Sequence, residues 1–152
     1  MITSGITMYR STGSRLYLPI FLSHLSKAYA ELGQFDDAWR CIGEAMAAVE
    51  TTKERWYEAE IHRIAGEIAL KLPQLGSSQV GAYFERALTV ARAQQAKSWE
   101  LRAAMSMARL WHDHGMQEKA RALLAPIYGW FTEGFDTVDL EQAKALLDEM
   151  SS

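Results

Sequence analysis

The stretch LSKAYAELGQFDDAWRCIGEAM, residues 25–46, returns in altered form as MARLWHDHGMQEKARALLAPI, residues 107–127. In both copies an aromatic residue precedes a glycine by four positions, and apolar residues follow at helical spacing. Helical spacing on both sides of each glycine predicts two helices joined by a tight turn. The matched positions are 82 residues apart (111 − 29 = 82), and they are Tyr29 and Trp111, Gly33 and Gly115, Ala38 and Ala120, Ile42 and Leu124, and Ala45 and Ile127.

A third copy lies between these two. Phe84 and Ala87 take the places of Ile42 and Ala45, so the units follow one another at intervals of 42 (84 − 42) and 40 (124 − 84) residues. One such helix pair cannot bury its own apolar face, and successive pairs must therefore pack on one another. Sustained alternation of apolar and polar residues does not occur in the sequence, so the chain is predicted to be all-α.

The helix boundaries in the first half of the chain follow from capping and stop signals. The first helix is expected to begin near Ser14 and to stop at Gly33, with residues 35–50 as the second. A third helix is expected to start at a T-x-x-E capping box, Thr51 to Glu54, and to run to about Leu72.

Four further helices are expected in the second half. They cover residues 79–95, 99–114, 117–131 and 139–150. Ser98 is the expected cap of the helix at 99–114, and Asp136 or Thr137 that of the last helix. Pro126 predicts a kink or an early end in the helix at 117–131.

Composition excludes several classes of protein. The 152 residues carry a net charge of -3, which gives no general attraction to a phosphate backbone, so no nucleic-acid partner is expected. The longest nearly apolar run, residues 122–131, is far shorter than the roughly 20 residues of a membrane span. A single cysteine, Cys41, fits a reducing compartment, and a cytoplasmic location with no membrane partner is expected.

The repeated pattern resembles the tetratricopeptide repeat (TPR), with a large apolar and a small residue in the first helix, a turn glycine, and Ala-x-x-x-Phe-x-x-Ala in the second helix. Repeat 1 matches at Leu22, Leu25, Ser26, Tyr29, Gly33, Ala38, Ile42 and Ala45, and repeat 3 at Ala104, Met107, Ala108, Trp111, Gly115, Ala120 and Leu124. The first helix of repeat 2 is uncertain in register by one residue. The preferred inward positions are Ile61, Ile64, Ala65 and Ile68, because this choice gives helical spacing and aligns Trp56 with Trp99 of repeat 3.

The resemblance implies a fold and a division of the chain. The fold is a right-handed superhelical α-solenoid of about three TPR-like helix pairs plus a C-terminal capping helix. Residues 1–152 form a single domain in which 1–13 are the end of a preceding repeat or an N-terminal arm, 14–50 are repeat 1, 51–96 are repeat 2, 97–131 are repeat 3, and 136–150 are the capping helix. Trp130, Phe131 and Phe135 are expected to pack between repeat 3 and that cap.

A narrower resemblance covers three long stretches: ERWYEAEIHRIAGEIAL, AKSWELRAAMSMARLW and YGWFTEGFDTVDLEQAKALLDEM. They are similar to the C-terminal TPR region of bacterial signalling proteins that combine an AAA- or STAND-type ATPase with an adenylate or guanylate cyclase. The chain itself has no G-x-x-x-x-G-K-[ST] phosphate loop. The resemblance therefore implies, as an alternative function, a C-terminal regulatory or sensor fragment of a larger ATPase and cyclase protein.

No residue set points to catalysis, a cofactor or a metal, and the chain is expected not to be an enzyme. His112 and His114 are two positions apart, where helical side chains diverge by about 200° and cannot share one ion. Glu58 and His62 have the spacing of a helical ion pair on the surface. Cys41 is expected to serve as a small buried hydrophobe.

The function implied by the TPR resemblance is protein–protein interaction, with a peptide segment or partner domain bound in the concave groove of the first helices. Basic residues at these positions favour an acidic segment. Pairing with a second copy of the chain through an exposed N-terminal end, where Ile6 and Met8 lie, is an alternative. The expected partner-binding residues are Lys27, Glu31, His62, Arg102, Met105 and Arg109, with Ser23, Gly66 and Asp113 at neighbouring groove positions.

Overall fold

The computed structural model describes residues 18–53, 55–72, 74–134 and 137–151. All the regular secondary structure in these ranges is helical, so the all-α prediction is confirmed. The seven helices of the described ranges are α2 (Leu18–Glu31), α3 (Phe35–Thr52), α4 (Glu58–Leu70), α5 (Ser77–Ala93), α6 (Lys97–Asp113), α7 (Gln117–Trp130) and α8 (Val138–Met150). The expected start near Ser14, and the N-terminal arm with Ile6 and Met8, lie outside the described residues.

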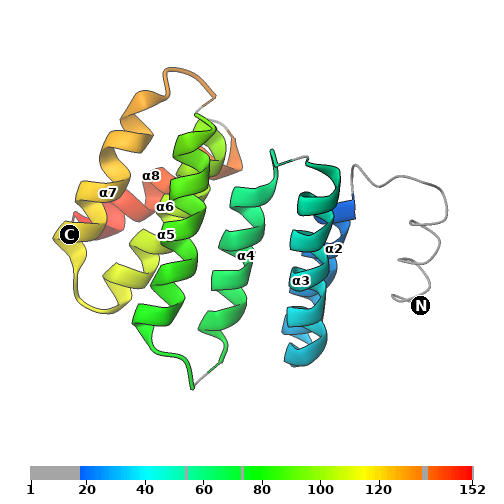
Figure 1. Cartoon of the computed structure of the whole chain (residues 1–152). Coiled ribbons are helices and arrows are strands. Elements are labelled where there is room, and N and C mark those ends of the chain that lie inside the picture. Colours follow the sequence, from blue (N-terminus) through cyan, green and yellow to red (C-terminus); the bar gives the residue numbers. More distant parts are fainter. Residues whose placement is uncertain (1–17, 54, 73, 135–136, 152) are drawn as a thin grey trace.

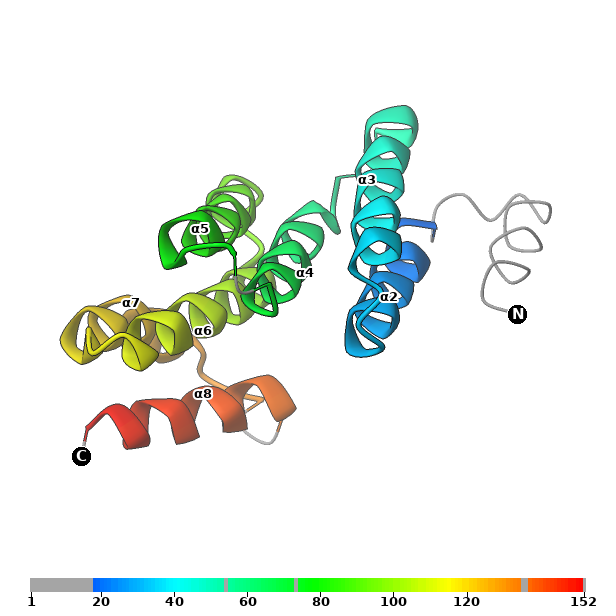
Figure 2. The same ribbon diagram turned by 90° about the horizontal axis from the view of Figure 1, so that it is seen from below.

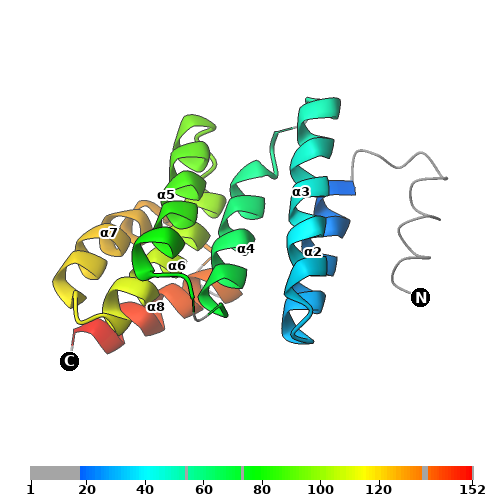
Figure 3. The ribbon, with the colours of Figure 1, turned by 60° about the horizontal axis from the view of Figure 1, so that its bottom comes forward.

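The helices form consecutive pairs, α2 with α3, α4 with α5 and α6 with α7, and each pair shares an extensive contact. The first helices of the pairs, together with α8, also touch one another in the order α2, α4, α6, α8. The pair of α2 and α3 stands at one end of the molecule, and α7 and α8 lie at the other (Figure 1). Seen from below, and again in the tilted view, α8 lies beside α6 on the side away from α5 (Figures 2 and 3). The first helices and α8 thus form a layer of their own.

The two repeated glycines end their helices in the same way. Gly33 and Gly115 both have φ +78°, a conformation that glycine adopts without a steric penalty. The amide after each glycine donates to the carbonyl of the matched aromatic residue, from Gln34 to Tyr29 at 2.9 Å and from Met116 to Trp111 at 2.8 Å. These bonds satisfy carbonyls that a helix end otherwise leaves free. The sequence repeat is therefore also a repeat of hydrogen bonding.

Two of the predicted caps are wrong. Helix α3 continues through Thr51 and Thr52, and it ends at Lys53 in a left-handed conformation (φ 62°). The Thr52 hydroxyl donates to the carbonyl of Ala48 at 2.8 Å, so it bonds back into its own helix and does not cap a following one. Helix α4 begins only at Glu58, and α6 begins at Lys97 without the Ser98 cap.

The later capping and proline predictions have mixed outcomes. The Thr137 hydroxyl accepts the amide of Leu140 at 3.4 Å, so Thr137 caps α8 as one of the two expected residues, while Asp136 lies outside the described residues. Helix α7 continues past Pro126 to Trp130, and no early end occurs.

Two helices approach one another closely at Gly66 of α4. A Cβ atom added there would lie 2.4 Å from Cε1 of Phe84, which belongs to α5 and is completely buried. The absence of a side chain at Gly66 therefore lets the Phe84 ring lie directly against the α4 backbone. This contact determines which side of α4 faces α5.

We expect Gly66→Ala to destabilise the protein by about 1–3 kcal/mol, because the cost of overpacking exceeds the roughly 1 kcal/mol that alanine gains in helix propensity. Gly43→Ala is the matched control, since a Cβ at that helical position of α3 meets no atom of the described residues within 4 Å. It should leave the protein as stable or more stable. Urea unfolding followed by circular dichroism measures both, and equal stabilisation by the two substitutions would contradict the steric argument.

Candidate interaction cleft

A cleft of about 370 Å³ lies between α2 and α4. Its apolar part consists of Ala30, Ile68 and Leu70. Charged residues of both signs line the rest of the cleft, and they are Lys27 and Glu31 from α2, Arg63 and Glu67 from α4, and Lys71 directly after α4. We refer to this site as the α2–α4 cleft.

The α2–α4 cleft brings together two of the residues expected from the sequence, Lys27 and Glu31. They are four positions apart, so they share one face of α2. Within the described ranges neither side chain forms an ion pair, although charged residues of α4 line the same cleft. Both charges therefore remain available to a bound partner.

The residues that α4 contributes differ from the expected ones. Arg63 and Glu67 line the cleft, each one position after the expected His62 and Gly66. The preferred inward residues Ile61, Ile64, Ala65 and Ile68 are all buried, as expected, but the groove positions paired with them, His62 and Gly66, do not line the cleft. Spacing of charges along α4, at intervals of four from Arg63 to Lys71, is the signal that could have revealed this face.

His62 and Met105 do not face an open groove, contrary to expectation. His62 is 8% exposed and Met105 is 3% exposed. The cause for His62 is the orientation of α4, which turns the neighbouring Gly66 toward Phe84. Met105 belongs to the apolar cluster that includes Leu140, Ala143 and Leu146 of α8, so the C-terminal helix contributes to its burial.

Arg102 and Arg109 of α6 have different surroundings. Arg109 is exposed, as expected of a residue that meets a partner. Arg102 instead places Nη1 2.5 Å from Oε2 of Glu60 and Nε 3.7 Å from Oδ1 of Asp139. Its charge is thus neutralised within the chain by carboxylates from α4 and α8.

Glu60 is the centre of a polar network between α4 and α6. Its side chain is only 3% exposed, and its two carboxylate oxygens accept from Arg63 at 2.6 and 3.0 Å. The Ser106 hydroxyl of α6 donates to Glu67 at 2.7 Å and also lies 3.4 Å from Nη1 of Arg63. Burial alone would lower the pKa of Arg63, but the hydrogen bonds and charge of Glu60 outweigh it and raise that pKa. The network fills the gap between α4 and α6 that a partner would otherwise enter.

His62 and Glu58 form the predicted helical pair, with Nε2 and Oε2 3.3 Å apart. The pair is mostly buried rather than on the surface. Burial lowers the pKa of His62, and this effect exceeds the opposing influence of the Glu58 carboxylate. His62 is therefore a neutral, structural side chain near pH 7.

The other residues considered for chemistry are separated from one another. His112 lies 3.7 Å from a Glu149 carboxylate oxygen, whereas Nδ1 of His114 bonds to the Leu110 carbonyl at 2.8 Å. Among the described residues no group of three His, Cys, Asp or Glu side chains is placed to hold a metal ion. Cys41 is buried in the apolar core, as predicted.

The aromatic residues around the end of α7 differ from expectation in part. Phe131 packs against the apolar cluster of α5 to α8, as expected of a residue beneath the cap. Trp130 is 58% exposed, and Nζ of Lys97 lies 5.5 Å from the centre of its ring. Trp130 is therefore a surface residue, while Phe135 lies outside the described residues.

No protein-family model matches the chain, and no curated protein is similar enough to count as a relative. In the described part of the chain, no helix combines the length and the apolar character that crossing a membrane requires. The cleft and the network therefore have to be interpreted from their own geometry.

We expect Glu60→Gln to lower the free energy of unfolding by about 3–5 kcal/mol, because it leaves the Arg63 and Arg102 cations without their shared buried carboxylate. Asp148→Asn is the control, since Asp148 pairs with Lys144 on the surface, where both side chains are more than 60% exposed. That change should have little effect. Urea unfolding compares the two variants, and similar small losses would show that the Glu60 network is not needed for stability.

Stability should fall as the pH drops below neutral, and His62 should contribute to that fall. Its pKa is lower in the folded than in the unfolded protein, so the unfolded chain binds the proton more readily and acid favours unfolding. The loss begins near the unfolded value of about 6.5 and cannot exceed about 1.4 kcal/mol per pH unit for one group. His62→Gln should flatten the slope of unfolding free energy between about pH 7.5 and 5.5, whereas His24→Gln, at an exposed position, should leave it unchanged.

Proposed function

We propose that the chain is a non-catalytic protein-interaction scaffold and that it binds an extended segment of a partner protein in the α2–α4 cleft. Its architecture, on this proposal, is a right-handed superhelical α-solenoid of TPR-like helix pairs with α8 as the capping helix. The repeated turn at Gly33 and Gly115 and the ordered contacts of the first helices support that assignment.

The observation that carries the proposal is a set of charged side chains without partners around an apolar floor. Lys27, Glu31 and Lys71 line the cleft, and within the described ranges none of them forms an ion pair. By contrast, the charges between α4 and α6 are neutralised by one another. Apolar surface with a few free polar groups is typical of sites that bind a ligand and fix its orientation.

The charges favour a partner segment that carries carboxylates. Lys27 and Lys71 are free cations on opposite walls, whereas the one free anion is Glu31, when only the described residues that line the cleft are considered. Arg63 lies in the same cleft, but Glu60 and Glu67 already neutralise it. An apolar residue on Ile68 and Leu70, with acidic neighbours toward the lysines, would satisfy both parts of the cleft.

Peptides selected from a random displayed library against the native protein test this proposal. We expect the selected peptides to be enriched in Asp and Glu. The double variant Lys27→Glu with Lys71→Glu should bind these peptides about tenfold or more weakly, as measured by fluorescence anisotropy. Lys144→Glu, on the exposed face of α8, is the matched control and should bind normally.

The same experiment has outcomes that would reject the proposal. Selected peptides without acidic enrichment would remove the charge argument, and unchanged affinity in the double variant would remove the cleft as the site. Circular dichroism and unfolding of the double variant should match the native protein, because both lysines are exposed.

A further inference from the structure

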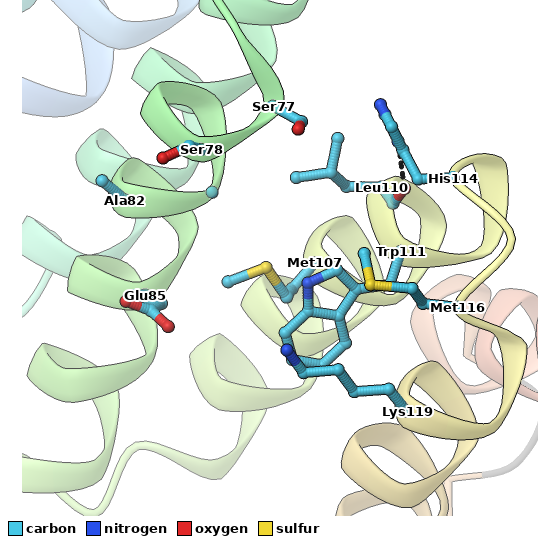
Figure 4. Close-up of a pocket in the computed structure, with 11 residues that line it drawn as sticks. Ser77, Ser78, Ala82, Glu85, Met107, Leu110, Trp111, His114, Met116 and Lys119 are labelled. Atoms are coloured by element: carbon cyan, nitrogen blue, oxygen red, sulfur yellow. Dashed lines mark hydrogen bonds between the residues drawn. The ribbon is translucent and has the colours of Figure 1, made fainter.

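A second cavity, of about 310 Å³, lies where the start of α5, the end of α6 and the start of α7 meet. It shares no lining residue with the α2–α4 cleft. Two of its walls come from α5 and α7, the second helices of their pairs, and α6 forms its floor (Figure 4). We refer to it as the Trp111 pocket.

The floor of the Trp111 pocket is apolar and polarisable. In the close-up, the indole of Trp111 lies at the centre with the thioethers of Met107 and Met116 beside it (Figure 4). Met107 is almost fully buried, whereas Met116 is 41% exposed. Methionine side chains adapt their shape to a bound group and make favourable contacts with aromatic rings, so this floor suits an aromatic or large aliphatic side chain.

Small residues on α5 leave this floor uncovered. The wall opposite Trp111 consists of Ser77, Ser78, Gly81 and Ala82, followed by Glu85. A Cβ added at Gly81 would meet only Cδ2 of Leu110, at 3.7 Å, within the described residues. The gap is therefore a consequence of side-chain size along one face of α5.

Opposite charges stand on the two walls. Nζ of Lys119, on α7, lies over one face of the Trp111 ring, 4.4 Å from its centre, and Glu85 lies on the α5 wall. Neither residue forms an ion pair with any of the described residues. A ligand seated on Trp111 therefore meets a cation on one side and an anion on the other.

His114 adds a polar group of known orientation at the upper edge of the pocket. Its Nδ1 bonds to the Leu110 carbonyl at 2.8 Å, and because a carbonyl can only accept, Nδ1 carries the proton (Figure 4). In the neutral ring Nε2 is consequently an acceptor. It can receive an N–H group from a bound backbone.

We propose that the Trp111 pocket is a second protein-binding site, distinct from the cleft, that takes a partner segment with an apolar anchor residue between one acidic and one basic residue. The anchor lies on Trp111, Met107 and Met116. The acidic residue pairs with Lys119, and the basic residue pairs with Glu85. The pocket is open on one side, which suits a side chain carried by a partner better than a small molecule that must be enclosed.

The probe is acetyl-Glu-Phe-Lys-amide, titrated into the full chain with ¹³C-labelled methionine methyl groups and followed by nuclear magnetic resonance. We expect saturable shifts of the Met107 and Met116 methyl signals, with Met46 and Met150 as internal references outside the pocket. Exchange of Phe for Ala in the peptide should abolish the shifts. Equal shifts of all four methionines, or none at Met107 and Met116, would overturn the proposal.

A change of charge preference tests the two walls separately. Lys119→Glu should bind the Lys-Phe-Lys peptide at least threefold better than the mixed one, and Glu85→Lys should prefer Glu-Phe-Glu by a similar factor. Retention of the native preference by both variants would reject the assignment of the charges. Both positions are exposed, so the fold should be unaffected.

A plug variant tests the position of the site. Ala82→Trp, at an exposed position that lines the pocket, should remove binding of all three peptides. Ala93→Trp, at an exposed position near the other end of α5, is the matched control and should bind like the native protein. Equal binding by both tryptophan variants would exclude this pocket, whatever the outcome for the α2–α4 cleft.

Discussion

The carboxylate of Glu60, shared by the guanidinium groups of Arg63 and Arg102, links α4 to α6. A buried carboxylate is costly unless cations and hydrogen bonds surround it. Arg63 reaches Glu60 from the same helix, whereas Arg102 reaches it only if α4 and α6 stay close. Arg102 extends the link to Asp139 of α8. Ion pairs and apolar packing thus join α4, α6 and α8, whereas the described part of α2 supplies no charged residue to this network. The open cleft lies where the network ends.

The two gaps between first helices differ in how their charged groups are paired. Between α4 and α6, Ser106 leaves room for Arg63 and donates its hydroxyl to Glu67, so charged groups fill the space and neutralise one another. Between α2 and α4, Ala30 lines the open cleft with a methyl group. This methyl group offers no hydrogen bond, and the charged side chains nearby line the rest of the α2–α4 cleft. Charged side chains therefore pair with one another between α4 and α6, whereas between α2 and α4 they line an open cleft.

The helices and turns could be predicted from the sequence because their signals are local. Spacing within about 20 residues and a glycine at each turn define the pairs. The orientation of α4 could not be predicted in this way, because Ile61, Ile64, Ala65 and Ile68 are buried together with His62 and Gly66, and periodicity does not distinguish the sides of a helix buried on several faces. The contact of Gly66 with Phe84 decides it, and the two residues are 18 positions apart (84 − 66 = 18). The cleft residues on α4 were missed for the same reason.

The start of α5 departs from the repeat pattern, and this departure opens the Trp111 pocket. In repeat 1 the second helix begins with Phe35 and continues with Trp39, and both pack against the apolar core. The second helix of repeat 2 begins with Ser77 and Ser78 and continues with Gly81 and Ala82, which are too small to reach Trp111 across the pocket. Trp111, near the end of α6, occupies the repeat position that Tyr29 occupies in repeat 1. Tyr29 is buried, yet Trp111 is partly exposed. A repeat can therefore keep its core and still expose an aromatic ring where the neighbouring helix of the preceding repeat begins with small residues.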